Sequence, residues 1–207
     1  MANETGAFGL RPVKHLNGSP YNGATRKCYI SDSYATALYV GDAVILTDET
    51  DYTDPLAKCM SIEKATGADG EAPLGVIVSF EVDADNLGYN YNPASNERYA
   101  NVCIDPSVIY HIRDDGGLTP TKSNFINLNG VIDVTGSGST VTGLSGMTLD
   151  TDDAPAADAS NPLFILGLAD IPNNELAVNA VWEVMISNHR LSNDGDDVGR
   201  MLGIASS

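Results

Sequence analysis

The stretch Gly75-Val-Ile-Val-Ser-Phe-Glu-Val82 decides the fold class of this chain. Its apolar residues recur at every second position, and this period is typical of a half-buried β-strand, whose successive side chains point to opposite faces. We therefore expect a strand here and a protein built from sheets. One face of the strand is apolar and the other is mixed: Val76, Val78, Phe80 and Val82 against Ile77, Ser79 and Glu81.

Other stretches along the chain give the same signal. Residues 163–168 form an apolar run, interrupted only at Gly167, that is long enough for one buried strand. Residues 177–186 predict a core strand, although the lack of Gly and Pro there leaves a helix as the alternative. The side chains that share one face of this second stretch are Val178, Ala180, Trp182, Val184 and Ile186.

The composition supports a fold of strands and turns. Glycine, proline, aspartate and asparagine, the residues of turns, number 20, 10, 20 and 17 among 207 residues. Good helix formers are scarce, with 8 glutamates, 5 lysines and no glutamine. The length allows one compact domain or two small ones. We expect an all-β fold: a short-stranded β-barrel or β-sandwich body with an extended N-terminal arm.

Turn residues and charge suggest four regions. Residues 1–27 combine frequent Gly and Pro with scattered apolar residues, so we expect an extended arm that either packs on a partner or folds back on its own domain. Residues 28–113 predict a β-barrel-like region, and 114–190 a second β region packed on it. Residues 191–207 form a polar tail. Within the second region, 134–146 is either a weak edge strand or an exposed ribbon.

Charge is unevenly distributed. The net charge is −17, but the first 30 residues hold four cations and one acidic residue, and no Lys or Arg lies between Lys122 and Arg190. Nucleic-acid binding needs several clustered cations, so we expect no nucleic-acid partner. The acidic excess either serves solubility or marks an acidic body with a basic arm that docks on an acidic surface.

We expect neither a membrane segment nor a cysteine framework. No apolar run reaches 18 residues, and MANETGAFGL lacks the basic and apolar regions of a secretory signal. Cys28, Cys59 and Cys103 lie far apart without a CxxC pair, which argues against a zinc site or disulfides and suggests a reducing compartment.

Catalytic motifs are missing from the sequence. There is no GxSxG elbow, and no GK[ST] follows the glycines of 136–140. We interpret His111 as a structural strand residue and Cys103 as a buried thiol. Two aspartate clusters, 48–54 and 194–197, fit solvated loops better than calcium sites, because neither has the order of EF-hand ligands. We expect no enzyme activity, no cofactor and no metal.

Several motifs resemble a known group of proteins. The opening Gly6-Ala-Phe-Gly-Leu-Arg-Pro-Val-Lys-His-Leu-Asn-Gly18 resembles the N-terminal arm of small structural proteins of tailed bacteriophages, the head decoration (cement) or minor capsid proteins. Gly41-Asp42-x-Val44-x-Leu46 and the later Leu74-Gly75-Val76 are similar to the β-barrel part of such proteins. The likeness continues at 163–168, 172–174 and 187–190, but 135–161 and the tail have no counterpart.

The resemblance implies a non-enzymatic protein of the virion, made in the host cytoplasm. Such a protein binds the outside of the capsid as a homotrimer and has the major capsid protein as its partner. We expect Phe8, Leu10 and Val13 to fill apolar grooves of that partner, and Arg11 and Lys14 to pair with its acidic groups. The loop with Tyr89 and Tyr91 is either an intersubunit contact or a cover for its own barrel.

Two other functions stay open at this point. One is a tail or head–tail joining protein, which would assemble as a ring of six or twelve copies, whereas a cement protein would have three. The other is a carbohydrate-binding β-sandwich with Tyr89, Tyr91 and Trp182 as sugar platforms, although the apolar face around Trp182 argues against it.

Overall fold

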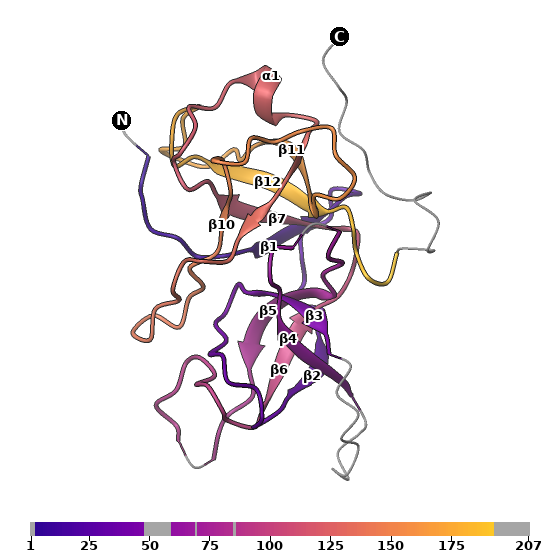
Figure 1. Cartoon of the computed structure of the whole chain (residues 1–207), viewed down its shortest axis with the longest axis vertical. Helices are drawn as coiled ribbons and strands as arrows, with labels where there is room; N and C mark the ends of the chain where they lie inside the picture. Colours follow the sequence, from indigo (N-terminus) through magenta and orange to yellow (C-terminus); the bar gives the residue numbers. More distant parts are fainter. Residues whose placement is uncertain (1–2, 48–58, 69, 85, 193–207) are drawn as a thin grey trace.

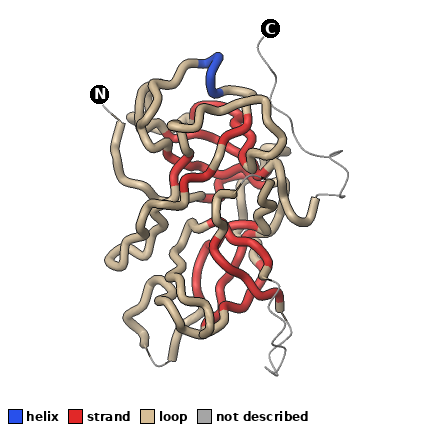
Figure 2. Tube along the Cα trace, viewed as in Figure 1, coloured by secondary structure: helices blue, strands red, loops and turns tan. Residues whose placement is uncertain are grey.

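The computed structural model describes residues 3–47, 59–68, 70–84 and 86–192. Figure 1 shows two stacked blocks of strands, and Figure 2 shows the loops that surround them. The elements are β1 (Arg11–His15), β2 (Arg26–Ile30), β3 (Ala43–Leu46), β4 (Met60–Lys64), β5 (Gly75–Phe80), β6 (Arg98–Cys103), β7 (Val108–Arg113), α1 (Lys122–Phe125), β8 (Asn129–Gly130), β9 (Ile132–Asp133), β10 (Thr148–Leu149), β11 (Leu163–Leu168) and β12 (Val181–Ile186).

The lower block is a closed five-stranded barrel. Its strands follow the order β2-β4-β3-β5-β6, and β6 pairs with β2 to close the ring. Only the β2–β4 contact is parallel. The barrel interior is apolar and holds buried side chains such as Ile30, Val44 and Val102. The expectation of an all-β fold with a barrel is therefore confirmed.

The upper block is an antiparallel sheet in the order β1-β7-β12-β11-β8, with a small β9–β10 pair beside it. The stretch 177–186 forms a strand and not a helix, but β12 begins only at Val181. Val178 is 38% exposed and Asn179 has a φ of +60°, so the chain turns just before the strand. Trp182 and the alternate residues after it lie in the core as expected.

A second core lies between the barrel and the upper sheet. Val76 and Val78 of β5 face this core, whereas Ile77 faces the barrel interior. The pairing of β5 with β6 shifts register between Ile77 and Ser79, so Phe80 packs with the barrel interior and not with Val76. The expectation that one face runs on to Val82 is wrong, because the strand ends at Phe80 and Val82 is 79% exposed.

The strands group differently from the expected regions. β1, inside the expected arm, is the edge strand of the upper sheet, and β2 begins before residue 28. β7, expected in the barrel region, also belongs to the upper sheet, where it pairs with β1 and β12. Residues 134–146 form an irregular loop with a single bridge from Leu144 to Val40.

Cys103 is fully buried in β6, as expected, and the structure joins none of the three cysteines by a disulfide. In the part of the chain that the structure describes, no helix has the length and apolar character needed to cross a membrane.

Candidate partner-binding surfaces

The N-terminal segment is fixed to the upper sheet from its first described residue. The side-chain amide of Asn3 donates to the backbone carbonyls of Glu175 at 2.9 Å and Val178 at 3.1 Å. Its side-chain oxygen accepts from the Glu175 amide at 2.9 Å. Residues 3–15 therefore lie along their own protein as a structural segment.

Arg113 forms a second anchor for this segment. Its guanidinium donates to the carbonyls of Gly6 at 3.0 Å and Asn179 at 2.8 Å, and also to the carbonyl of Glu4. Burial lowers the pKa of this guanidinium, which the three carbonyls solvate in place of water. Arg113 therefore joins the start of the chain to the turn before β12.

Leu10 lies elsewhere than expected. It is 1% exposed and belongs to the core between the two blocks, so its side chain is not available to a partner. Its amide donates to the Gly41 carbonyl at 2.9 Å. Gly9 makes this close approach possible, because its φ is +69° and an added Cβ would lie 2.3 Å from the Gly41 oxygen.

Phe8 and Arg11 stay at the surface. The ring of Phe8 is half-buried between two guanidinium groups, with Arg11 4.7 Å and Arg113 5.7 Å from its centre. Both residues border a cavity of about 270 Å³, the Phe8 groove, whose apolar lining includes Val40, Val78 and Leu144. The groove therefore offers an apolar lining and a cation at its rim.

Val13 and Lys14 both form contacts within their own chain. The Lys14 amine lies 2.8 Å from a Glu183 carboxylate oxygen, and His111 lies 3.6 Å from the same oxygen. Val13 sits at the register shift between β1 and β7, and its carbonyl accepts from the Tyr21 amide at 3.1 Å. Of the five expected docking residues in the arm, Phe8 and Arg11 are the best placed to meet a partner.

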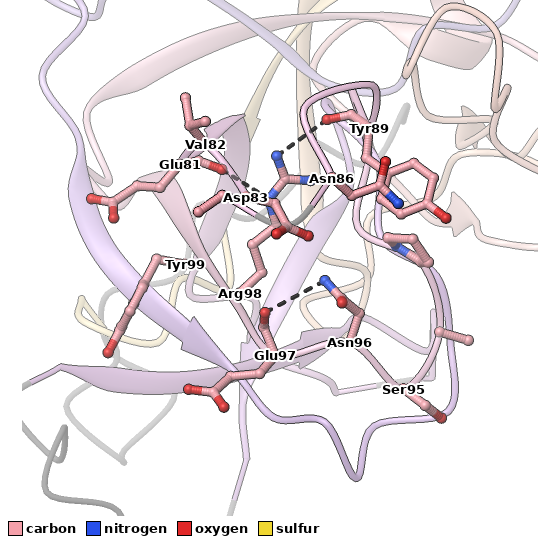
Figure 3. Close-up of a pocket in the computed structure, with 13 residues that line it drawn as sticks. Glu81, Val82, Asp83, Asn86, Tyr89, Ser95, Asn96, Glu97, Arg98 and Tyr99 are labelled. Atoms are coloured by element: carbon pink, nitrogen blue, oxygen red, sulfur yellow. Dashed lines mark hydrogen bonds between the residues drawn. The ribbon is translucent and has the colours of Figure 1, made fainter.

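The loop between β5 and β6 is organised by Arg98, as Figure 3 shows. The Arg98 guanidinium donates to the carbonyls of Glu81 at 2.8 Å, Tyr91 at 2.6 Å and Tyr89 at 3.1 Å. Burial lowers its pKa, against the opposing effect of Asp83. Arg98, itself buried, is one of the residues that line an open basin of about 680 Å³. The arginine therefore gives the loop a defined shape.

Tyr89 and Tyr91 come together with a third tyrosine from a distant part of the chain. The ring of Tyr91 stacks on Tyr39 with 5.2 Å between centres and 10° between planes. Tyr89 is tilted against Tyr91 at 5.6 Å. All three rings are partly accessible, so the loop both covers its barrel and presents aromatic surface.

The loop 135–146 lies against this tyrosine loop. The Asn90 side-chain amide donates to the Val141 carbonyl at 3.0 Å, and an added Cβ on Gly143 would lie 2.5 Å from the Asn90 oxygen. At its base, the Ser145 hydroxyl donates to buried Asp42 at 2.5 Å, and burial raises the pKa of Asp42. Sequence reasoning missed this contact, although the lack of charged residues from 134 to 149 was visible.

The structure places the other candidate residues away from these surfaces. Trp182 is fully buried and donates to Asp114 at 3.0 Å, so it provides no sugar platform. His111 is a strand residue of the upper sheet whose pKa burial lowers. Across the described ranges, no group of three His, Cys, Asp or Glu could hold a metal ion. The aspartate clusters at 48–54 and 194–197 lie outside the described residues.

No protein-family model, curated protein or solved structure matches this chain.

Proposed function

We propose that this chain is a non-enzymatic structural protein of a tailed phage that binds the outside of the capsid. There it stabilises the shell as a homotrimer by clamping neighbouring major capsid subunits. The resemblance of residues 6–18 to the arms of cement proteins supports this function. Its location is the virion exterior, after synthesis in the host cytoplasm.

The observation that carries the proposal is the pairing of Arg11 with Phe8 at the rim of an apolar groove. Arg11 is exposed, and within the described residues its guanidinium has no carboxylate within ion-pair distance. In a protein of net charge −17, such a cation favours an acidic group on a partner. The partner surface then supplies one apolar side chain for the groove and one carboxylate for Arg11.

The N-terminal segment would act as a fixed surface and not as a free arm. Because β1 and Leu10 belong to the fold, the N-terminal segment presents Phe8 and Arg11 from a fixed position. A preordered surface loses less conformational entropy on binding than a free arm does. Each clamp adds contacts that must break before the shell opens, and three copies in one trimer bind together through effective concentration.

Co-sedimentation with capsids that lack this protein tests the proposal. Burying a phenylalanine contributes ~1.5–3 kcal/mol, whereas a surface ion pair contributes ~0–1 kcal/mol. Phe8→Ala should therefore weaken binding most, Arg11→Ala less, and Lys14→Ala least. Lys122→Ala, an exposed cation on α1, is the matched control.

Two outcomes of this co-sedimentation assay would contradict the proposal. If high salt removes the protein completely while Phe8→Ala stays bound, charge and not the groove determines attachment. If no variant binds capsids and the wild type does not bind either, the proposed function fails. Each variant needs a thermal melt, because the Phe8 ring also contacts Arg113.

A further inference from the structure

The most exposed large apolar side chains of the described residues lie on two loops. Val141 is 86% exposed, and Val82 and Leu87 are each 79% exposed. Val141 belongs to the loop 135–146, and the other two belong to the loop between β5 and β6. Figure 1 shows both loops on the left side of the molecule. Val82 stands between Glu81 and Asp83, whereas Val141 and Leu87 stand on stretches without charge, where exposed apolar surface can mark an interaction site.

These loops are also free of charged residues over long stretches. Residues 33–41, 86–96 and 134–149 contain no Asp, Glu, Lys or Arg. The rest of the chain must therefore hold all 28 acidic residues. Depletion of charge is what distinguishes the centre of a protein interface from the remaining surface.

The structure brings these three segments together. Backbone bridges join Leu38 to Asn92 and Val40 to Leu144. Tyr39 stacks on Tyr91 and also meets the third segment, since an added Cβ on Gly138 would lie 2.2 Å from the Tyr39 ring. We name the surface formed by 38–40, 86–92 and 135–146 the uncharged surface. It is ordered before any partner arrives, because Arg98 and these bridges hold its parts.

The charge of the whole protein indicates which partner fits. Two copies of a chain with net charge −17 repel each other wherever acidic groups meet. An interface between copies is therefore favoured where no charged group has to be desolvated or brought beside its like. A basic partner would gain nothing from a surface without carboxylates.

We propose that the uncharged surface is the interface between copies of this chain. A threefold axis through the surface brings each copy's Val141 and tyrosine stack against those of its neighbours. The contact supplies the trimer of the proposed function and in that respect rests on it. Self-association is nevertheless a property of the isolated protein and can be measured without capsids.

The response to salt distinguishes self-association from attachment to the capsid. Screening weakens the repulsion between the acidic bodies, so raising salt from about 0.05 M to about 0.5 M should maintain or strengthen self-association. The same change should modestly weaken the pairing of Arg11 with an acidic partner. The two contacts should therefore respond to salt in opposite directions.

Sedimentation velocity of the wild type and two variants over a concentration series tests the proposal. Val141→Asp adds a carboxylate at the uncharged surface and should raise the dissociation constant at least about tenfold, since like charges at an interface cost several kcal/mol. Leu176→Asp adds the same charge to an exposed leucine on the turn before β12 and should leave self-association unchanged. Both variants should fold, because both side chains are exposed, and circular dichroism checks this.

Three results would overturn the proposal. These are a wild type that stays monomeric throughout the series, equal dissociation by both variants, and an oligomer that salt disrupts. A monomer that binds polysaccharide through the tyrosines would instead identify the surface as a sugar site. A wild type that associates as expected but does not bind capsids would contradict the proposed function and leave this interface standing.

Discussion

Arg113 and Arg98 hold two irregular segments of this protein by the same means. Each guanidinium donates to three backbone carbonyls, Arg113 to the N-terminal segment and the turn before β12, and Arg98 to the tyrosine loop. Each also lies over a phenylalanine ring, Phe8 or Phe80. Burial lowers the pKa of both side chains.

The two segments nevertheless have different roles in the fold. The N-terminal segment continues into β1, which pairs with β7, and it places Leu10 in the core. The described residues of the tyrosine loop, which connects β5 to β6, form no strand of their own, and Leu87 is 79% exposed. Backbone pairing and one buried side chain, and not the arginine clamp, therefore decide which segment is structural. The first is part of the core, and the second is a shaped surface.

Among these changes, deletion of residues 2–20 should lower the thermal stability most. It removes β1 and Leu10 and leaves Arg113 without two of its three carbonyl partners. We expect loss of the cooperative thermal transition measured by circular dichroism. Replacing Asn86 and Leu87 by glycine is the control in the other segment and should keep the transition. An unchanged melt after the deletion would show that the N-terminal segment is not part of the core.

One leucine substitution in each segment tests whether the two segments contribute differently to stability. Leu10→Ala should lower the free energy of unfolding by about 2–5 kcal/mol, because it leaves a cavity in the core. Leu87→Ala should change it by no more than about 0.5 kcal/mol, because this side chain is in water. Chemical denaturation gives both values. Equal effects would remove the distinction between the two segments.

Acid should destabilise the upper sheet more than the tyrosine loop. Burial lowers the pKa of His111, which pairs with Arg11 across β1 and β7, and lowers that of His189 to about 4. The folded state then binds fewer protons than the unfolded state, so stability falls as pH drops below the ordinary histidine pKa of about 6.5. For His189 the loss should reach about 2 kcal/mol at pH 5, at 1.36 kcal/mol per unit.

Hydrogen exchange at pH 7 and pH 5 measures this prediction. Amides of β1 and β7 should lose protection at the lower pH, while those of residues 86–96, which contain no histidine, should follow only the global change. His189→Gln should reduce the pH dependence of the melting temperature. A melting temperature that is constant over this range would contradict the assigned burial of both histidines.

Arg98→Ala should have the smallest effect on global stability. Two of its three carbonyl partners, Glu81 and Tyr89, line the open basin, where water can replace the guanidinium, so we expect a loss of about 1 kcal/mol. The local effect should be larger, with faster chymotrypsin cleavage at Tyr89 and Tyr91. Arg26→Ala, at an exposed arginine of β2, is the matched control. Unchanged cleavage would mean that Arg98 does not hold the loop.

Strands with a regular period were predictable, and departures from that period were not. Trp182 and Ile165 occupy core positions that their neighbours in sequence already indicated. The register shift after Ile77 turned Phe80 to the other face, and no local pattern marks such a shift. The sequence did not predict β1, because its apolar Val13 sits at another register shift, between flanking glycines and prolines.

The candidate surfaces were predictable only in part. The sequence identified Phe8, Arg11 and the tyrosine loop as exposed groups, because aromatic and charged residues stand there among turn residues. It did not identify Tyr39 as the partner of Tyr91, since these residues are 52 positions apart and meet only through the barrel. The burial of Leu10 likewise depends on Gly41, a long-range contact without a local signal.

The position of the barrel within the chain bears on the order of folding. β1 and β7 are neighbours in the upper sheet, yet all five barrel strands lie between them in sequence. Pairing His15 with Val108 directly would close a loop of about 93 residues. The barrel joins its own first and last strands, with Arg26 opposite Val102, so its prior formation shortens the open chain to about 17 residues.

That shortening lowers the entropic cost of closure by about 1.5 kcal/mol. Docking of β1 beside β7 should therefore follow barrel formation, because the barrel leaves only a short open chain to close. Until then the growing sheet has an unpaired edge, which is the state most open to misassembly between chains.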